Sequence, residues 1–404
     1  MRRFVLFFII ISFFTSGWSK FAEPVHAKAN DYLLKPTSSS RKKATPLLTS
    51  SQSAALIDVS TGRIVYSQQG DRSLPIASLT KIMTAIVAIE QGNLSDKVKV
   101  SKNAFGKEGS SIYLKLGETI SLNDLLYGLM LRSGNDAATA IAEHVGGSLE
   151  GFVYLMNQKA EQLGMDHSHF LNPHGLDAAG HHASANDMAK LTAYALHNPI
   201  FKEIVKTQSK KVTREDQPWD SVWTNKNKML VLYPGSDGVK TGFTKIARRC
   251  LVSSATRDHQ QFVAVTLNDG NDWADHSRML DYGFKNYPLR QAINKGEQLD
   301  GRVIARQTYS YPATEAEQAL FRREVRMTAP GSVAARLGEK GRIILYLGQQ
   351  RIGSVPLELL PKQELIEKTS SHVDDKDQHR LTISFHQRFR ANLKNILINL
   401  ISWD

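Results

Sequence analysis

Residues 77–90 read Ala-Ser-Leu-Thr-Lys-Ile-Met-Thr-Ala-Ile-Val-Ala-Ile-Glu. From Leu79 to Ile89 most side chains are apolar or small, which is typical of a helix buried on all sides at the centre of a domain. Ser78 stands at the start of this helix and Lys81 follows one turn later, so both lie on one face near the positive end of the helix dipole. The stretch therefore predicts a buried central helix with a serine and a lysine at its first turn.

The pairing of Ser78 with Lys81 predicts nucleophilic catalysis. A serine hydroxyl is a poor nucleophile unless a nearby base takes its proton. A lysine can be that base only when burial or neighbouring cations lower its pKa, and the apolar residues 82–86 argue against a surface lysine. The Ser-x-x-Lys spacing alone is weak, because the polar segment 39–42 also contains it by chance.

A second motif, Ser133-Gly134-Asn135, falls in a short break between two predicted helices. Side chains at such a break can project into a cleft, where they can pass protons or orient a peptide carbonyl. The alternative is that they cap the second helix, a role that Asp136 can also take. The presence of the other motifs favours catalysis for Ser133 and Asn135.

A third motif, Lys240-Thr241-Gly242, lies in a predicted strand, where an extended peptide can pair with the strand edge. Lys240 and Thr241 can bind the terminal carboxylate of that peptide, and Gly242 lets the two backbones approach closely. A charge-assisted hydrogen bond contributes about 1.5–3 kcal/mol. A free C-terminus should therefore be strongly preferred over an internal amide. No metal or cofactor is indicated.

The N-terminus has the features of a secretory signal peptide. Arg2 and Arg3 precede an apolar run from Phe4 to Phe14, and small residues at 27–29 form a cleavage site. The run is short of the ~20 residues that span a bilayer, so a retained transmembrane anchor is the weaker interpretation. Cleavage would lower the formal charge from +12 to +9 by removing four basic residues and one acidic residue.

Charge and cysteine content narrow the class of partner. A basic secreted protein favours anionic surroundings, such as cell-wall polymers or acidic lipid headgroups. Nucleic acid is not expected, because no nucleic-acid motif is present and export argues against it. The single cysteine, Cys250, lies in an apolar stretch, so no internal disulfide can form and a buried, unreactive thiol is predicted.

The order of elements predicts an α+β fold in which helices pack on one antiparallel sheet closed by N- and C-terminal strands. After residue 290 the chain changes to short β-type pieces, and residues 380–404 carry apolar side chains in steps of three and four. Predicted strands are 54–59, 63–67, 238–244, 250–254, 261–267, 301–305, 342–347 and 351–357, and predicted helices are 79–89, 122–131, 137–145, 149–163 and 186–196.

These patterns divide the chain into six predicted regions. The last of them resembles an amphipathic helix lying in a membrane interface, with a docking helix as the alternative. The regions are a signal peptide (1–29), a flexible lead-in (30–50), a catalytic domain (51–290), a small β domain (291–367), a linker (368–379) and an amphipathic membrane-anchor helix (380–404).

The three motifs together resemble the D-alanyl-D-alanine carboxypeptidases of the serine penicillin-binding protein superfamily, as do the wider phrases 131–138 and 237–244. Residues 172–177 and 268–273 are most similar to the sporulation-associated members of Bacillus-type bacteria. The signal peptide and the amphipathic tail predict a secreted enzyme, held peripherally at the outer face of the cytoplasmic membrane. Its expected substrate is a peptidoglycan stem peptide ending in D-Ala-D-Ala, from growing wall or spore cortex, and β-lactams are expected to acylate it.

The resemblance also implies individual roles. Ser78 would be the acylated nucleophile and Lys81 its base, Ser133 and Asn135 would relay protons and bind substrate, and Lys240 with Thr241 would bind the carboxylate. The N–H groups of Ser78 and Phe243 would form an oxyanion hole. One departure is Arg248, where many relatives have glycine; it either adds positive charge near the carboxylate or faces solvent.

Two other functions share parts of this pattern. A β-lactamase has the first and third motifs together with a glutamate that drives water onto the acyl-enzyme, but no Glu-x-x-Leu-Asn segment occurs between Ser133 and Lys240. A sensor that is acylated without turnover is the second alternative. Such sensors usually carry firm transmembrane helices, which the sequence lacks.

Overall fold

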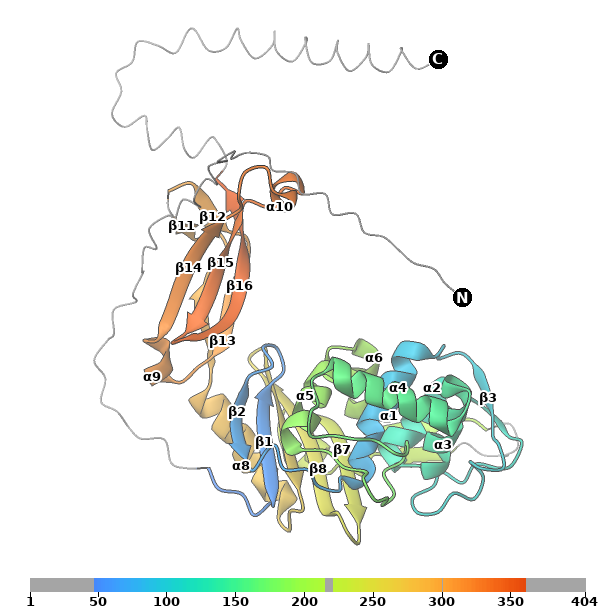
Figure 1. Ribbon diagram of the computed structural model, residues 1–404. Helices are drawn as coiled ribbons and strands as arrows, with labels where there is room; N and C mark the ends of the chain where they lie inside the picture. Colours follow the sequence, from blue (N-terminus) through green and yellow to red (C-terminus); the bar gives the residue numbers. More distant parts are fainter. Residues whose placement is uncertain (1–46, 215–220, 300, 361–404) are drawn as a thin grey trace, which may run out of the picture.

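The computed structural model describes residues 47–214, 221–299 and 301–360 (Figure 1). Its N-terminal part is built on a five-stranded antiparallel sheet with the strand order β2-β1-β9-β8-β7. The strands of this sheet are β1 (Ser53–Asp58), β2 (Ile64–Gln68), β7 (Ser236–Thr244), β8 (Arg248–Arg257) and β9 (Gln260–Leu267).

The sheet joins the two ends of this part of the chain. β1 pairs with β9 along its whole length, for example Leu56 with Ala264, and β7 forms the edge next to β8. β1 and β9 are buried throughout, because helices cover the two faces of the sheet. The predicted α+β fold, with one antiparallel sheet closed by N- and C-terminal strands, is confirmed.

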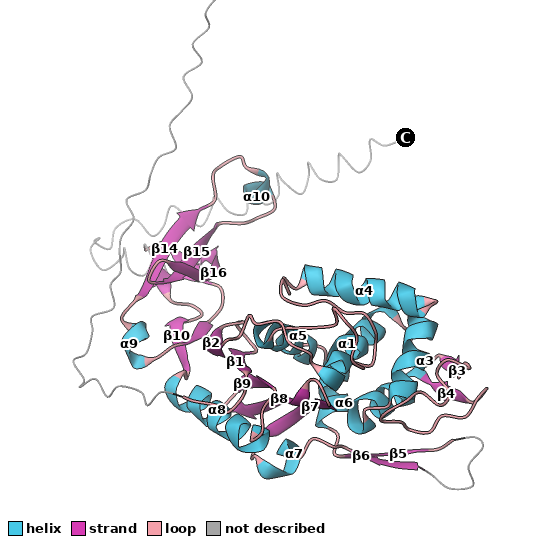
Figure 2. Cartoon of the chain, turned by 60° about the horizontal axis from the view of Figure 1, so that its bottom comes forward, coloured by secondary structure: helices cyan, strands magenta, loops and turns pink. Residues whose placement is uncertain are grey.

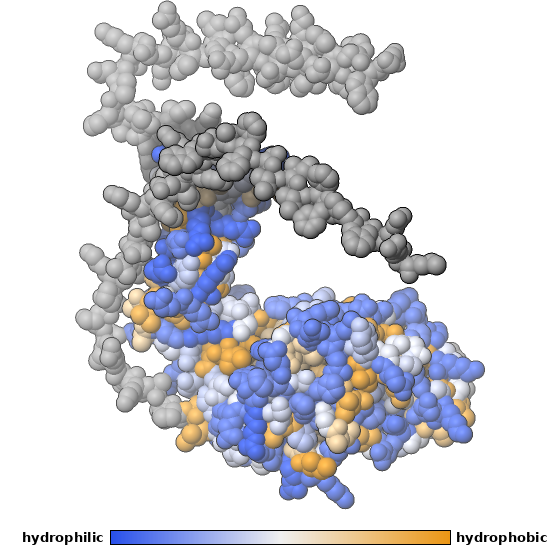
Figure 3. Space-filling model, in the orientation of Figure 1, coloured by the Kyte–Doolittle hydropathy of each residue, from blue (hydrophilic) through white to orange (hydrophobic). Residues whose placement is uncertain are grey.

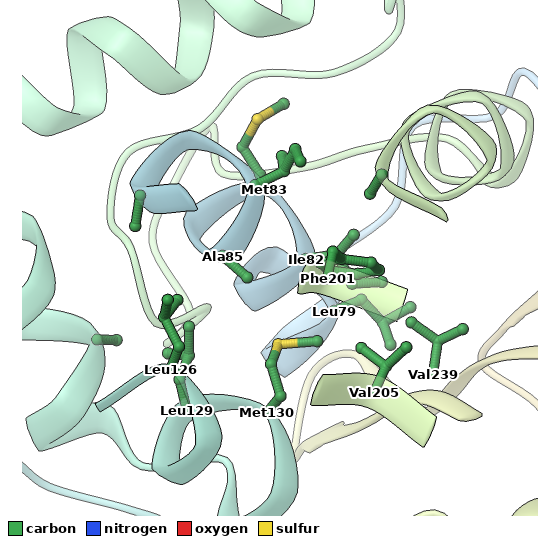
Figure 4. Packing of buried hydrophobic residues seen from close by; sticks show 14 of the residues in the cluster. Leu79, Ile82, Met83, Ala85, Leu126, Leu129, Met130, Phe201, Val205 and Val239 are labelled. Atoms are coloured by element: carbon green, nitrogen blue, oxygen red, sulfur yellow. The ribbon is translucent and has the colours of Figure 1, made fainter. Parts of the chain in front are cut away.

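Most helices cover one face of the sheet and surround α1 (Figure 4). Residues 81–89 of α1 are all buried, and Ile82 and Ala85 pack among apolar side chains from the surrounding elements. The helical elements of this face, with α1 itself included, are η1 (Ala77–Thr80), α1 (Lys81–Gln91), α2 (Leu122–Tyr127), η2 (Gly128–Arg132), α3 (Asn135–Gly146), α4 (Leu149–Gln162), α5 (Ala185–Leu196) and α6 (Pro199–Lys206).

One long helix, α8 (Asp272–Asn286), packs on the other face of the sheet (Figures 1 and 2). Its buried Met279 and Leu280 belong to the same apolar cluster as Leu56 and Phe262. This helix was not predicted from the sequence, because its many polar residues obscure the narrow stripe of apolar ones. Ser50, at the end of the predicted lead-in, donates two hydrogen bonds to Asp275 of α8, so residues 47–50 belong to the fold.

A second sheet, in the order β11-β12-β16-β15-β14, follows α8 and has its own apolar core. Arg63, the residue before β2, joins the two parts, since its guanidinium donates to the Pro312 carbonyl and pairs with Glu317, both at 2.5 Å. The elements here are β10 (Leu289–Ile293), β11 (Gln298–Leu299), β12 (Val303–Ala305), β13 (Tyr309–Pro312), α9 (Glu315–Gln318), β14 (Phe321–Met327), α10 (Val333–Arg336), β15 (Gly341–Leu347) and β16 (Gln350–Leu359).

Short elements complete the first part of the chain. They are β3 (Lys97–Lys99) with β4 (Thr119–Ser121), the hairpin β5 (Ser209–Val212) with β6 (Ser221–Thr224), and α7 (Met229–Leu232). Among the described helices, none has the length and apolar character needed to cross a membrane. The predicted signal peptide, most of the lead-in, the linker and the C-terminal amphipathic helix lie outside the described residues.

Candidate active site

Ser78 lies in η1, the single turn that leads directly into α1, and its side chain is half-buried. The preceding Ala77 has a φ of 47°, in the left-handed region that non-glycine residues rarely adopt. Strain of this kind persists only where the surrounding structure holds it, and it is common at functional sites. The turn thus presents Ser78 at the N-terminal end of the buried central helix.

Lys81 lies beneath Ser78 and is fully buried. Its Nζ donates to Ser78 Oγ at 3.0 Å, to Asn135 Oδ1 at 2.7 Å and to the His174 carbonyl at 2.5 Å. Burial lowers the pKa of Lys81 well below its ordinary value, and the positive charges of Lys240 and Lys226 lower it further. A lysine whose pKa is lowered in this way can accept a proton from the neighbouring hydroxyl more readily than an exposed lysine can.

Ser133 and Asn135 flank the point where η2 ends and α3 begins. Ser133 is buried and has a φ of 64°, which turns the chain sharply between the two helices. Asn135 holds Lys81 through its Oδ1, while its Nδ2 donates to the Glu108 carbonyl at 2.7 Å. The N-cap of α3 is Gly134, with no side-chain capping bond, so the simple capping alternative does not describe these two residues.

Asp136, the other capping candidate, has a different task. Its carboxylate accepts hydrogen bonds from the backbone N–H groups of Ile112, Leu114 and Ala137 and from the Ser111 hydroxyl. It therefore fixes the loop beside Asn135 against the start of α3.

Lys240 lies on β7, the edge strand, and is buried like Lys81. Its Nζ donates to Ser133 Oγ at 3.0 Å and to the Thr241 carbonyl at 2.8 Å. Burial, with the positive charge of Lys226 as a smaller cause, lowers the pKa of Lys240 to about 7. The structure thus joins all three sequence motifs through two buried lysines.

The rest of the third motif lies against the serine turn. A Cβ atom at Gly242 would come within 3.1 Å of the Ile76 carbonyl oxygen and 3.2 Å of the Ser78 nitrogen, so only glycine allows this close approach without a shift. Thr241 and Phe243, two residues apart in β7, lie on the same face of the strand; Thr241 is half-buried and Phe243 is exposed. A pocket of about 470 Å³, lined by Ala77, Gly175 and Ile246 among others, opens beside this turn.

The loop 172–177 supplies contacts that the sequence analysis did not assign to the site. The His174 carbonyl binds Lys81, and the Pro173 carbonyl accepts from Thr84 of α1 at 2.6 Å. At the end of the loop, Asp177 accepts a 2.8 Å hydrogen bond from Thr244 of β7, so the loop bridges α1 and the edge strand. A backbone carbonyl leaves no signal in the type of its residue, which explains the omission.

Lys226 is a second residue that the motifs did not reveal. Its Nζ donates to Ser110 Oγ at 3.2 Å, and its charge lowers the pKa of both Lys81 and Lys240. Lys226 thus adds positive charge close to the two buried lysines. No local motif marks Lys226, since it lies in the turn that follows β6.

Comparison with known proteins identifies the family. Residues 40–271 match the family model described as Peptidase_S11, D-alanyl-D-alanine carboxypeptidase. The chain belongs to this family. It is a serine-type D-alanyl-D-alanine carboxypeptidase, of a family that acts on D-Ala-D-Ala ends of peptidoglycan peptides.

Individual S11 relatives extend the match. D-alanyl-D-alanine carboxypeptidase DacF of Bacillus subtilis is 37% identical over 264 residues, which cover 63% of this chain and 68% of the relative. Among solved structures, penicillin binding protein 5 from Haemophilus influenzae is 25% identical with a TM-score of 0.65, covering 78% of this chain and 98% of that one. Penicillin binding protein 6B from Escherichia coli is 28% identical with a TM-score of 0.62, covering 80% and 99%.

Arg248 is the position at which many S11 relatives were expected to have glycine. It opens β8 opposite Thr244, is exposed and has a φ of 60°. Glycine adopts this left-handed conformation without steric cost, so the backbone here favours glycine over arginine. Exposure is consistent with the interpretation that Arg248 faces solvent.

Proposed function

We propose that Ser78 is the nucleophile that this carboxypeptidase acylates and that Lys81 is its general base. The observation that carries the proposal is the 3.0 Å contact between Lys81 Nζ and Ser78 Oγ, made by a fully buried lysine with a lowered pKa. Neutral Lys81 accepts the hydroxyl proton as Ser78 Oγ bonds to the carbonyl carbon of the penultimate D-alanine. The peptide C–N bond then breaks, and the amine of the terminal D-alanine leaves with a proton.

The other motif residues complete the cycle. Ser133 Oγ, bound to Lys240, is placed to relay that proton, and Asn135 orients both Lys81 and the peptide. The N–H groups of Ser78 and Phe243 stabilise the oxyanion, an arrangement in which one donor contributes about 2.7–4 kcal/mol. Water, activated by the same base, hydrolyses the ester and restores the Ser78 hydroxyl.

We further propose that Lys240 and Thr241, assisted by Lys226, bind the terminal carboxylate. The close approach of Gly242 to residues 76–78 supports this placement, because it sets the edge of β7 beside the nucleophile. Charge-assisted hydrogen bonds in a buried site favour a free carboxylate over an internal amide. This accounts for removal of the last residue alone.

The direct test is release of D-alanine from a synthetic peptide ending in D-Ala-D-Ala, using the protein without residues 1–29. Turnover, together with a covalent adduct on the segment of the enzyme that contains Ser78, supports the proposal. Labelling by a fluorescent penicillin without any D-alanine release would instead favour the sensor alternative.

The two buried lysines predict a bell-shaped pH profile for kcat/KM. Activity should rise with pH as Lys81 loses its proton through its lowered pKa, because only neutral Lys81 is a base. It should fall above a pH of about 7 as Lys240 loses the charge that attracts the carboxylate. The profile is measured by D-alanine release across the pH range.

A matched substrate separates the two limbs. A peptide ending in D-alanyl-D-alanine amide has no carboxylate for Lys240 to attract, so the alkaline limb should disappear while the acidic limb remains. An alkaline limb of unchanged position on the amide would contradict the role of Lys240.

We propose that β-lactams acylate Ser78 in the same way as the peptide, and that the natural substrate is spore cortex. The 37% identity to DacF of a Bacillus species and the resemblance of residues 172–177 and 268–273 support the cortex setting. Analysis of wall peptides from a strain lacking the gene tests it. Excess pentapeptide in vegetative wall, with unchanged cortex, would contradict the cortex assignment.

We also propose that residues 1–29 direct secretion and that residues 380–404 anchor the enzyme to the outer face of the cytoplasmic membrane. The apolar residues of that tail recur on one helical face beside Arg388, Arg390 and Lys394. Deleting residues 380–404 should release most of the enzyme from sedimented membranes while D-alanine release is kept. Unchanged sedimentation would contradict the anchor.

A further inference from the structure

The β domain ends in a tip that points away from the catalytic domain. Residues 328–340 connect β14 to β15 and include α10, which lies at the far end of the domain in two views (Figures 1 and 2). The opposite end of the domain carries Pro312 and Glu317, which bind Arg63 of the catalytic domain. The tip is therefore the part of the described chain that projects beyond both cores.

Apolar side chains gather at this tip without being buried. Val333 and Leu337, in and just after α10, are 63% and 83% exposed, and Met327 at the end of β14 is 54% exposed. Leu359 at the end of β16 is 49% exposed and belongs to the same end of the sheet, since Leu357 borders Gly341. Large apolar residues from three segments thus meet solvent together, and clusters of this kind mark contact surfaces.

Basic side chains surround these apolar residues. From residue 327 to residue 342 the chain has three basic side chains and one acidic one. Arg336 and Lys340 are exposed, and Arg342 pairs with the single acidic residue, Glu339. In Figure 3, the part of the β domain that no grey atoms cover is mostly hydrophilic, with a few hydrophobic residues among the hydrophilic ones. The tip therefore combines exposed apolar side chains with a net positive charge.

This combination fits an anionic bilayer. Apolar side chains gain free energy on entering the boundary between headgroups and acyl chains, and the cations gain from the negative surface potential. The order of the chain agrees, because β16 ends at Leu359, so the residues that follow it in the sequence, including the proposed anchor 380–404, are joined to the protein at this end.

We propose that the tip formed by residues 327–342 and Leu359 is itself a membrane-contact surface, with Val333 and Leu337 entering the interface of an anionic bilayer. A folded contact next to the origin of the tail limits how the β domain tilts. It thereby directs the catalytic domain outward, toward the wall, in a way that a flexible tether alone does not. This surface is distinct from residues 380–404 and from the catalytic residues.

The test uses the full chain with Leu337→Cys labelled by an environment-sensitive fluorophore. Cys250 is buried, and burial raises the pKa of its thiol to about 12, so the introduced thiol reacts selectively. Vesicles of phosphatidylcholine with phosphatidylglycerol should shift the emission to the blue. Tyr154→Cys, at an exposed site on α4, is the matched control and should show no shift.

The charge contribution is tested by Arg336→Gln with Lys340→Gln in the labelled chain. Each basic side chain near an anionic surface changes partitioning about five-fold, so the double variant should need roughly 25-fold more vesicles for the same shift. Lys97→Gln with Lys99→Gln, exposed on β3, should change nothing. Sedimentation with vesicles but no shift at residue 337, or an equal shift on pure phosphatidylcholine, would overturn the proposal.

Discussion

The variant Ser78→Ala is expected to lose both D-alanine release and covalent labelling by penicillin, with kcat lower by about four to six orders of magnitude. The loss is this large because the acyl-enzyme cannot form without Oγ, and Lys81 then has no hydroxyl to deprotonate. The fold should persist, because Ser78 is half-buried at the surface of the site and its removal opens little space. Steady-state kinetics and gel fluorescence after penicillin treatment measure both losses.

The controls for Ser78→Ala come from the same chain. Ser39→Ala removes the serine of the chance Ser-x-x-Lys at residues 39–42 and should leave kinetics unchanged. An unaltered thermal transition for Ser78→Ala shows that the fold is intact. If Ser78→Ala still forms a stable penicillin adduct, the nucleophile is another residue and the proposed mechanism is wrong.

Gly175→Ala is expected to destabilise the protein strongly and to reduce kcat/KM at least about 100-fold. Gly175 has a φ of 82°, and a Cβ atom there would lie 1.9 Å from the Ala77 carbonyl oxygen. The clash is with backbone, so either the loop 172–177 or the turn that holds Ser78 must move. Movement of the loop also withdraws the His174 carbonyl from Lys81.

Gly180→Ala is the matched control for this effect. Gly180, three residues beyond the loop 172–177, has a similar φ of 92°, but its nearest neighbour, Leu171, would lie 3.6 Å from the added Cβ. Both variants share the cost of a left-handed residue, about 1–2 kcal/mol, so their difference isolates the clash. Urea unfolding should give a free energy at least about 3 kcal/mol lower for Gly175→Ala than for Gly180→Ala. Equal values would contradict the described packing of the loop on the serine turn.

Local sequence was sufficient for the elements whose pattern is strong. The helix from Lys81 is apolar on all sides, and the strands 238–244 and 261–267 were placed within two residues of β7 and β9. The polar helix α8 was missed, because a narrow apolar stripe among acidic and aromatic residues has no clear period. Helix α6 was missed as well, although Asn198 and Pro199 mark its start.

The residues of the active site likewise divide into those that the sequence identified and those that it did not. Ser78, Lys81 and Lys240 could be named from short motifs, because a nucleophile, a base and a carboxylate binder need particular side chains. The short motifs did not reveal the His174 carbonyl, the Asp177 carboxylate that binds Thr244, or the charge of Lys226. The roles of these groups depend on where the fold places them.

The sequence alone determined the buried helix, the three motifs and an α+β fold, because apolar periodicity and side-chain chemistry are local properties. Only the tertiary structure decided that Lys240 is buried as well, that the Nζ atoms of Lys81 and Lys240 bind Ser78 and Ser133, and that the pKa values of both lysines are lowered. Those properties come from desolvation and from Coulomb interactions among groups that are distant in the chain. Such interactions depend on distance and burial, which exist only once α1, η2 and β7 have packed together.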